Sequence, residues 1–134
     1  MTSADPTETI RTLMPFANTL GITVVRYGAD EVRARLAWDA ALCTSGGVMH
    51  GGALMALADS TGGACAFLNL PVGSAGTTTI ESKTNFLRAV REGYVESRSR
   101  PLHSGKTVIV VETDLRDERD RLVGRVTQSQ LVLT

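Results

Sequence analysis

The sequence has few of the residues that bind metal ions or crosslink a chain. It holds two cysteines, Cys43 and Cys65, and two histidines, His50 and His103, in 134 residues. Two cysteines do not make a disulfide framework, and so few soft ligands argue against a structural zinc site. We therefore expect two reduced core thiols, no metal and no cofactor.

An excess of charge of either sign is also missing, because 14 basic residues balance 14 acidic ones. A nucleic-acid-binding domain usually carries a basic patch, and this composition predicts none. Residues 1–18 contain acidic side chains and no seven-residue apolar centre, so they do not resemble a signal peptide. We expect a cytoplasmic protein without a nucleic-acid partner.

No repeat, linker or low-complexity segment divides the chain, and its length suits one domain with its own core. We therefore expect a single domain over residues 1–134. Near its start, Asp5-Pro6-Thr7-Glu8 has the order of an N-cap, a first-turn proline and a capping acid. Pro15 should end or kink this helix, so residues 1–18 are predicted to be a short helical segment.

The longest apolar stretch is Ser45–Leu70, which starts with glycines and continues without proline from residue 53. Its Ala, Leu and Met content predicts a helix of about 16–18 residues. The helix is apolar nearly all round, which predicts burial, but Asp59, Ser60 and Thr61 interrupt it too often for a membrane span. Asp59 is its only charge, and an interior carboxylate is costly unless it is paired or used.

Six further segments alternate or are rich in β-branched residues, and they are predicted as strands. They are residues 20–27, 31–38, 77–88, 94–102, 106–114 and 122–133. Between the last two, Arg116–Arg121 is expected to be a solvated, charged hairpin turn. In the third strand, four side chains are assigned to one face: Ile80, Ser82, Thr84 and Phe86.

Strands that alternate have one apolar face, and only the long helix is apolar enough to cover it. The prediction is an α+β fold in which one curved antiparallel sheet of six strands wraps around the helix. An open sheet of this kind usually needs a second copy to cover its edges.

Four short motifs follow one another: His50-Gly51-Gly52, Leu57-Ala58-Asp59, Asn85-Phe86-Leu87-Arg88 and Arg91-Glu92-Gly93. Together they resemble the hot-dog-fold acyl-CoA thioesterases of the phenylacetate-degradation type, which are related to the 4-hydroxybenzoyl-CoA thioesterases. The resemblance covers residues 20–133. It implies hydrolysis of an acyl-CoA thioester without metal, by a homodimer that is usually doubled to a homotetramer.

Gly51 and Gly52 open the helix, whose first turn carries unpaired N–H groups and a positive dipole end. Glycines let a substrate approach this backbone closely, and the resemblance implies that Gly51 donates to the thioester oxygen as it gains negative charge. Asp59 matches the family's catalytic carboxylate, acting either as a base that activates water or as the nucleophile. The alternative is a buried acid that Ser60 or the backbone satisfies.

His50 either orients the thioester, braces the glycine loop or is only a polar residue before the helix. Thr44 stands where the family usually has Asn or Gln, and Gly63 stands where the glutamate-using branch has a hydroxyl. The aspartate-using branch takes its hydroxyl from the following strand, where Thr79 or Thr78 fits. These differences leave the group that positions the water open.

Coenzyme A carries several phosphate charges, and four basic residues lie near predicted strand ends that the family uses near the nucleotide. They are Arg88, Arg91, His103 and Lys106. An ordinary basic surface explains each of them equally well. Two other functions remain open, a hot-dog dehydratase or hydratase and an acyl-CoA-binding module without turnover, although a binding module has no need of a buried acid.

His50 and Asp59 lie nine residues apart, which is an axial gap of roughly 12–14 Å on a helix. A base and an oxyanion donor must each come within a few ångströms of one carbon, so the pair of one chain is too widely spaced. A two-fold axis that places two helices antiparallel solves this problem. The sequence thus predicts a dimer in which Asp59 of one subunit faces Gly51 of the other, with Gly62 and Gly63 easing the packing.

Overall fold

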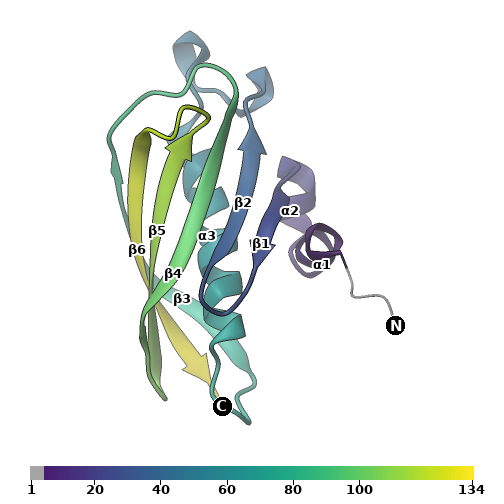
Figure 1. Cartoon of the computed structure of the whole chain (residues 1–134), viewed down its shortest axis with the longest axis vertical. Coiled ribbons are helices and arrows are strands. Elements are labelled where there is room, and N and C mark those ends of the chain that lie inside the picture. The colour runs from purple at the N-terminus through teal and green to yellow at the C-terminus, as the bar shows by residue number, and fades with distance from the viewer. Residues whose placement is uncertain (1–4) are drawn as a thin grey trace.

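The computed structural model describes residues 5–134 and shows one antiparallel sheet packed against a long helix (Figure 1). Two short helices, α1 (Pro6–Leu13) and α2 (Pro15–Leu20), precede strands β1 (Thr23–Tyr27) and β2 (Val32–Ala37). Two 3-10 turns, Ala40–Leu42 and Ser45–Gly47, lead into the long helix α3 (Gly51–Leu68). The chain ends with β3 (Gly76–Phe86), β4 (Tyr94–Ser104), β5 (Val108–Asp117) and β6 (Leu122–Leu133). The predicted α+β arrangement of six strands and one long helix is confirmed.

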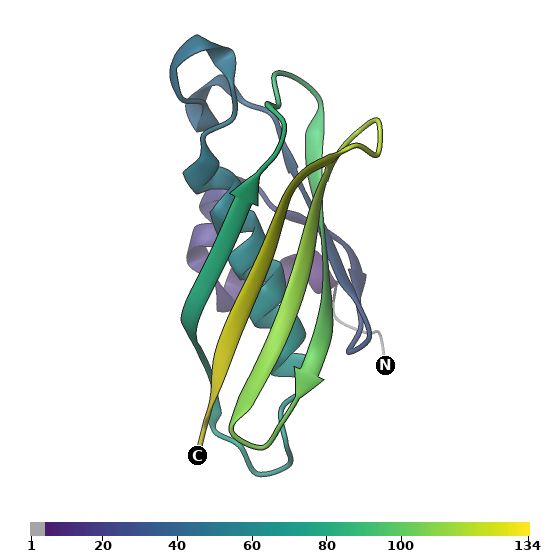
Figure 2. The ribbon, with the colours of Figure 1, turned by 90° about the vertical axis from the view of Figure 1, so that its left-hand side faces the viewer.

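The strands lie in the order β1-β2-β4-β5-β6-β3, and every neighbouring pair is antiparallel. Because β3 follows α3, the chain crosses the sheet and adds β3 beside β6 at the far edge from β1. Figure 2 shows α3 running behind these strands, with α1 and α2 on the same side of the sheet. The sheet therefore has two edge strands, β1 at one side and β3 at the other.

The N-cap and the first-turn proline predicted at the start of the chain are confirmed. The Asp5 carboxylate accepts a hydrogen bond of 3.0 Å from the amide of Thr7, and Pro6 occupies the first turn of α1. Pro15 kinks the segment, because α1 ends at Leu13 and α2 begins at Pro15 itself. Of the predicted helical segment 1–18, residues 1–4 lie outside the described range.

The long helix begins at Gly51, as expected from the two glycines that open it, and His50 caps it. The prediction that α3 is buried all round is wrong for the single chain. Leu57, Cys65 and their neighbours face the sheet and are buried, but Met55, Asp59 and Phe67 are exposed. The sheet covers one side of the helix, so these residues, spaced four and eight apart, form an open stripe. No helix within residues 5–134 has the length and apolarity that a membrane span requires.

A bulge in β3 changes which side chains face α3. Thr79 pairs with Gln130 and Glu81 pairs with Ser129, so Ile80 is an extra residue and its side chain is 58% exposed. The assignment of Ile80 to the same face as Phe86 is therefore wrong. Bulges reverse the alternation of a strand, and this one lets both Thr79 and Phe86 point toward α3.

The predicted charged turn between the last two strands is shorter than residues 116–121, because β5 extends to Asp117. The Asp117 carboxylate accepts hydrogen bonds from the backbone amides of Arg119 (3.0 Å) and Arg121 (2.9 Å). Burial alone would raise the pKa of Asp117, but these bonds and the Arg121 side chain outweigh it and lower the pKa. The Asp117 carboxylate thus stabilises the turn through hydrogen bonds, so the turn is more than a series of solvated charges.

The two cysteines are free, as expected, but only one lies in the core. Cys65 is buried on α3, and burial, helped by the charges of Asp30 and Glu31, raises the pKa of its thiol to about 11. Cys43 is half-buried between the 3-10 turns, so the prediction of two core thiols is wrong for Cys43.

On the face of the sheet away from α3, Glu96 joins two strands. Its side chain accepts hydrogen bonds of 2.8 Å from Arg35 on β2 and from Arg98 on β4. Burial acts to raise the pKa of Glu96, but the two guanidinium groups outweigh it and lower the pKa below the usual 4.5. A carboxylate with a lowered pKa stabilises the folded state above its unfolded pKa.

We predict that Glu96→Gln lowers the free energy of unfolding at pH 7 by about 1–3 kcal/mol, since hydrogen bonds to a charged group are lost. The difference from the unmodified protein should shrink as the pH falls below about 4.5 and through the lower folded pKa, because Glu96 is then protonated. Urea unfolding at several pH values measures this. The control is Glu81→Gln on exposed β3, and equal effects of both variants at pH 7 would contradict the assignment.

Candidate functional site

Asp59 lies where α3 meets strand β6 and the edge strand β3. Its Oδ1 atom accepts a hydrogen bond from the Thr79 hydroxyl at 3.1 Å and another from the Gln128 amide at 3.1 Å. Within residues 5–134 no donor contacts its Oδ2 atom, and the side chain is exposed rather than buried as predicted. One oxygen is therefore fixed by the protein while the other remains able to accept a proton.

The hydrogen bonds continue away from Asp59 along the sheet. Gln130 donates to the Thr79 hydroxyl at 2.6 Å, and the Thr77 hydroxyl donates to Gln130 Oε1 at 3.1 Å. Because Thr79 accepts from Gln130, its own proton is directed to Asp59. Of the two candidate hydroxyls on this strand, Thr79 and not Thr78 contacts the carboxylate.

Sequence reasoning missed both glutamines. Gln128 and Gln130 are 0% and 1% exposed, and they occupy the inward positions of β6 between the buried Val126 and Val132. A polar side chain at a core-facing position of an alternating strand must find hydrogen-bond partners. The inward position of both glutamines in the alternation of β6 was therefore the sequence signal that could have identified them. The Gln128 Oε1 atom is buried and has no partner among the described residues.

Gly62 makes room for Gln128. A Cβ atom placed on Gly62 would lie 1.8 Å from Gln128 Oε1, so a larger residue would displace the amide. Gly63, in contrast, has nothing within 4 Å of its Cβ position. For Gly62, the close packing expected beside the site is a contact within one chain, with the glutamine that donates to Asp59.

His50 caps α3, because its Nδ1 atom accepts a hydrogen bond of 2.7 Å from the amide of Gly52. The neighbouring amide of Gly51 has no acceptor within the described part of the chain. The Phe86 ring lies against Gly51, where an added Cβ would come within 3.0 Å of it. The first turn of α3 thus offers a free N–H group beside an aromatic wall.

Two different cavities adjoin these groups. One, of about 440 Å³, is lined by Thr44, Met49, Gly51, Phe86 and Leu87, among others. The second, of about 500 Å³, lies between α1, α3 and β3. Asp59 and Thr79 give this second cavity its polar wall, and the rest is largely apolar: Ile10, Leu13, Met14, Tyr27, Ala64 and Phe67. It can hold an apolar group next to a carboxylate.

The structure brings Asp59 together with Thr79, and Gly51 together with Thr44, but it does not bring the two pairs together. Asp59 lies eight residues after Gly51 on a continuous helix, an axial separation of about 12 Å. Because Thr44 lies at the Gly51 end of this separation, its hydroxyl cannot replace Thr79 at the carboxylate of the same chain. Gly52 donates to His50 and is exposed at the helix start.

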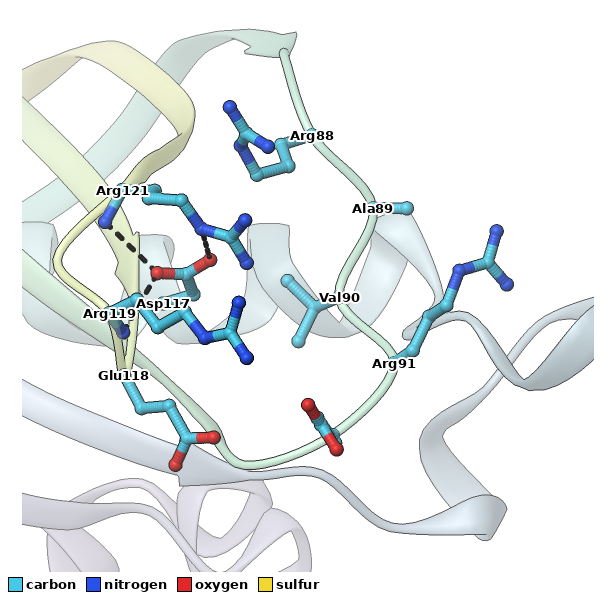
Figure 3. A pocket seen from close by; sticks show the side chains of 9 residues that line it. Arg88, Ala89, Val90, Arg91, Asp117, Glu118, Arg119 and Arg121 are labelled. Carbon is cyan, nitrogen blue, oxygen red and sulfur yellow. Dashed lines mark hydrogen bonds and ion pairs between the residues drawn. The ribbon is translucent and has the colours of Figure 1, made fainter.

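The four basic residues predicted near the nucleotide do not form one cluster. Arg88 and Arg91 line a pocket of about 300 Å³ after β3, together with Arg119 and Arg121 from the β5–β6 turn (Figure 3). His103 and Lys106 lie at the opposite end of β4, roughly 30 Å away at about 3.3 Å per residue. Sequence reasoning missed the two turn arginines because it treated the turn as solvated.

No three His, Cys, Asp or Glu side chains gather as a metal site anywhere in residues 5–134. At the second cavity, burial raises the pKa of Tyr27, which keeps its hydroxyl protonated and able to donate. The groups available for chemistry are thus a carboxylate, a backbone N–H, hydroxyls and amides.

We predict that Gly62→Ala lowers the free energy of unfolding by about 1–3 kcal/mol, because the new methyl group overlaps the Gln128 amide. The matched control is Gly63→Ala, one residue later on the same helix. There the space is open, and alanine should stabilise the helix by up to about 1 kcal/mol. Thermal unfolding compares them, and a Gly62 variant as stable as the Gly63 variant would refute the close contact.

Comparison with known proteins places these features in context. The sequence pattern of the Thioesterase superfamily matches residues 46–124. The 1,4-dihydroxy-2-naphthoyl-CoA hydrolase of Escherichia coli is 32% identical over 108 residues, which cover 78% of this chain and 79% of that protein. A thioesterase of Haemophilus influenzae superimposes with a TM-score of 0.88 at 28% identity, covering 100% of this chain and 93% of that one. The PaaI protein of the Escherichia coli phenylacetic acid degradation operon, 16% identical, shares the fold with a TM-score of 0.84 over 95% and 90% of the two chains.

Proposed function

Because the chain belongs to the thioesterase superfamily, we propose that it hydrolyses acyl-CoA thioesters with Asp59 as general base and the start of α3 as oxyanion site. The expected hot-dog fold and thioester hydrolase activity are those of the family. The products are a free acid and CoA, and the proposed reaction uses no metal or cofactor. The observation that carries the proposal is the Asp59 carboxylate, fixed through one oxygen and open at the other.

Asp59 suits the role of base because of how its hydrogen bonds are arranged. Thr79 and Gln128 both donate to Oδ1, which orients the carboxylate and leaves Oδ2 to take the proton of a water. The hydroxide attacks the thioester carbon and the carbonyl oxygen becomes negative. The thiolate of CoA then leaves and takes up the proton that Asp59 accepted from the water, which restores the carboxylate. Thr79 acts here as a positioning residue, since its proton is held by Asp59 itself.

Gly51 supports the second half of the reaction. Its N–H group is unpaired within the described residues and lies at the positive end of an 18-residue helix. A carbonyl oxygen that accepts this N–H is stabilised as it gains charge during attack. His50, through its bond to Gly52, holds the first turn in the shape that presents Gly51.

The axial separation of about 12 Å between Gly51 and Asp59 makes a second copy part of the proposal. In the single chain Asp59 lies on an exposed stripe of α3, and edge strand β3 presents Ile80 (58% exposed) and Phe86 (50% exposed). Exposed apolar groups on an unpaired strand favour pairing with another chain. We propose a homodimer with two shared sites, doubled to a homotetramer, in the cytoplasm.

The cavity beside Asp59 is the proposed acyl site. Its walls from α1, Tyr27 and Phe67 are apolar, and its volume of about 500 Å³ lies in the range of small-molecule sites. An acyl or aryl group placed there brings its carbonyl to the polar wall of Asp59 and Thr79.

We predict that Asp59→Asn lowers kcat for acyl-CoA hydrolysis by about 10²–10⁴, because the amide cannot accept the proton of water. The melting temperature should stay close to that of the unmodified protein, since Asn keeps an oxygen that can accept from Thr79 and Gln128. Release of free thiol, followed with a chromogenic disulfide, measures the rate. Unaltered turnover in a folded Asp59→Asn protein would show that Asp59 is not the base, and Glu81→Gln controls for loss of charge nearby.

A second prediction tests the shared site by mixing subunits. Gly51→Pro removes the oxyanion donor, and proline is tolerated at the first position of a helix. Gly51→Ala is its matched control, since it adds a similar Cβ against Phe86 but keeps the N–H group. Gly51→Pro and Asp59→Asn should each be inactive alone.

Unfolding and refolding the two inactive proteins together in equal amounts should restore about a quarter of the unmodified activity. Half of the dimers are then mixed, and each mixed dimer has one intact site of two. If co-assembled proteins stay inactive while both are folded, or a monomer is fully active, the shared site is wrong.

A further inference from the structure

The loop that leads into α3 contains two consecutive glycines in a left-handed conformation. The backbone angle φ is 79° at Gly46 and 73° at Gly47, and both residues are exposed. A Cβ atom placed on either glycine would meet nothing within 4 Å. Glycine adopts a positive φ without strain but loses much conformational freedom when it is fixed. Since the space around both positions is open, the shape of this loop depends on its hydrogen bonds.

Two side chains from distant parts of the sequence supply hydrogen bonds to this loop. The Arg91 guanidinium group, in the connection from β3 to β4, donates to the carbonyl oxygen of Gly46 at 3.2 Å. The indole N–H group of Trp38, which follows β2, donates to the carbonyl oxygen of Gly47 at 3.1 Å. Two neighbouring peptide groups of the loop are thus each held by a different element of the fold.

The backbone fixes these two donors relative to each other and to the loop. The amide of Trp38 donates to the carbonyl oxygen of Gly93, two residues after Arg91, at 2.8 Å. The amide of Met49 donates to the carbonyl oxygen of Val90, which directly precedes Arg91, also at 2.8 Å. The donors therefore belong to one frame that the sheet supports.

The same loop forms part of the cavity beside the proposed oxyanion donor. Thr44 and Val48 line the cavity of about 440 Å³ together with Gly51. The amide of Thr44 donates to the carbonyl oxygen of Val48 at 2.8 Å, which closes the loop on itself. A shift of the loop therefore displaces a wall of this cavity next to the Gly51 N–H group.

The orientation of Arg91 fits a contact with the loop. In Figure 3 its side chain points away from the guanidinium groups of Arg88, Arg119 and Arg121. It forms no ion pair with any acid of residues 5–134. The carbonyl oxygen of Gly46 is the polar group that its side chain contacts in the described part of the chain.

We propose that Trp38 and Arg91 are positioning residues that clamp the Gly46-Gly47 loop and so hold the oxyanion site in its active shape, which rests on the proposed function. Neither side chain lines the cavity beside Gly51, so each acts through a carbonyl oxygen of the loop. Placement matters because a displacement of about 1 Å at an active site can lower the rate about 10²-fold.

Two variants remove the donors and keep much of each side chain. Arg91→Met retains an unbranched apolar side chain, and Trp38→Phe retains an aromatic ring. Each should lower kcat for acyl-CoA hydrolysis about 3- to 30-fold and leave KM nearly unchanged, as expected when transition-state stabilisation is lost. The double variant should lose little more than either single variant, because both contacts hold one loop. Arg100→Met, at an exposed position of β4, is the matched control and should keep full activity.

A thioester of pantetheine, which lacks the nucleotide of CoA, distinguishes a clamp from a nucleotide contact. Arg91→Met should lower kcat for acyl-CoA and for acyl-pantetheine by the same factor. A rise in KM that is confined to acyl-CoA, with kcat unaltered, would assign Arg91 to the nucleotide and overturn the proposal. Activity that falls only in proportion to the amount of folded protein would also overturn it, since both residues would then be merely structural.

Trp38 is the only tryptophan of the chain, so its fluorescence reports on the clamp without turnover. Arg91→Met should increase the quenching of this fluorescence by acrylamide, because a released loop leaves the indole more open to solvent. The far-UV circular dichroism spectrum should not change. Quenching equal to that of the unmodified protein would overturn the clamp. Failure of the unmodified protein to hydrolyse any thioester would instead overturn the proposed function, and increased quenching in Arg91→Met would still support the clamp.

Discussion

The contact between Gly62 on α3 and Gln128 on β6 determines how closely the helix approaches the sheet. Because position 62 lacks a side chain, a fully buried amide fits between the two layers. Its nitrogen then donates to Asp59, and its oxygen remains unpaired within the described residues. A buried unpaired oxygen costs free energy, so the arrangement favours a precise placement of the carboxylate over maximal stability.

From that contact the rest of the site follows. The bulge at Ile80 turns Thr79 toward Asp59, and Gln130 holds the hydroxyl in the orientation that donates. The same bulge turns Phe86 toward Gly51, where it forms a wall of the cavity at the start of α3. A single irregularity in β3 therefore shapes both the surroundings of Asp59 and the cavity beside Gly51. The helix that presents both Asp59 and Gly51 also separates them by about 12 Å, which is why a second subunit enters the account.

Much of this could be predicted from the sequence, because periodicity and punctuation are local signals. The six strands, the long helix and the N-cap at Asp5 follow from alternation, apolar content and proline spacing. The isolated charge of Asp59 and the glycines that open the helix indicated the two ends of the candidate site. Neither feature depends on which strands become neighbours.

What the sequence did not predict depends on packing between distant segments. The bulge at Ile80 reverses which face of the sheet the following side chains of β3 point to. No proline or glycine at this position indicates a bulge in the sequence. The exposure of Asp59 depends on the sheet covering only one side of α3. The pocket lined by Arg88 and Arg119 depends on two segments, about 30 residues apart in the chain, that meet in space. Gln128 and Gln130 were visible as polar residues at inward positions, but their partners were not.

The central claim is that Asp59 activates a water molecule and does not attack the thioester itself. A single turnover in water enriched in oxygen-18, with enzyme in excess over an acyl-CoA, tests this directly by mass spectrometry of the acid released. If Asp59 is the base, the acid of this first turnover carries one oxygen-18 atom and the protein carries none. If the acid is unlabelled and the heavy oxygen appears in the Asp59 carboxylate, the carboxylate is the nucleophile and the account is wrong.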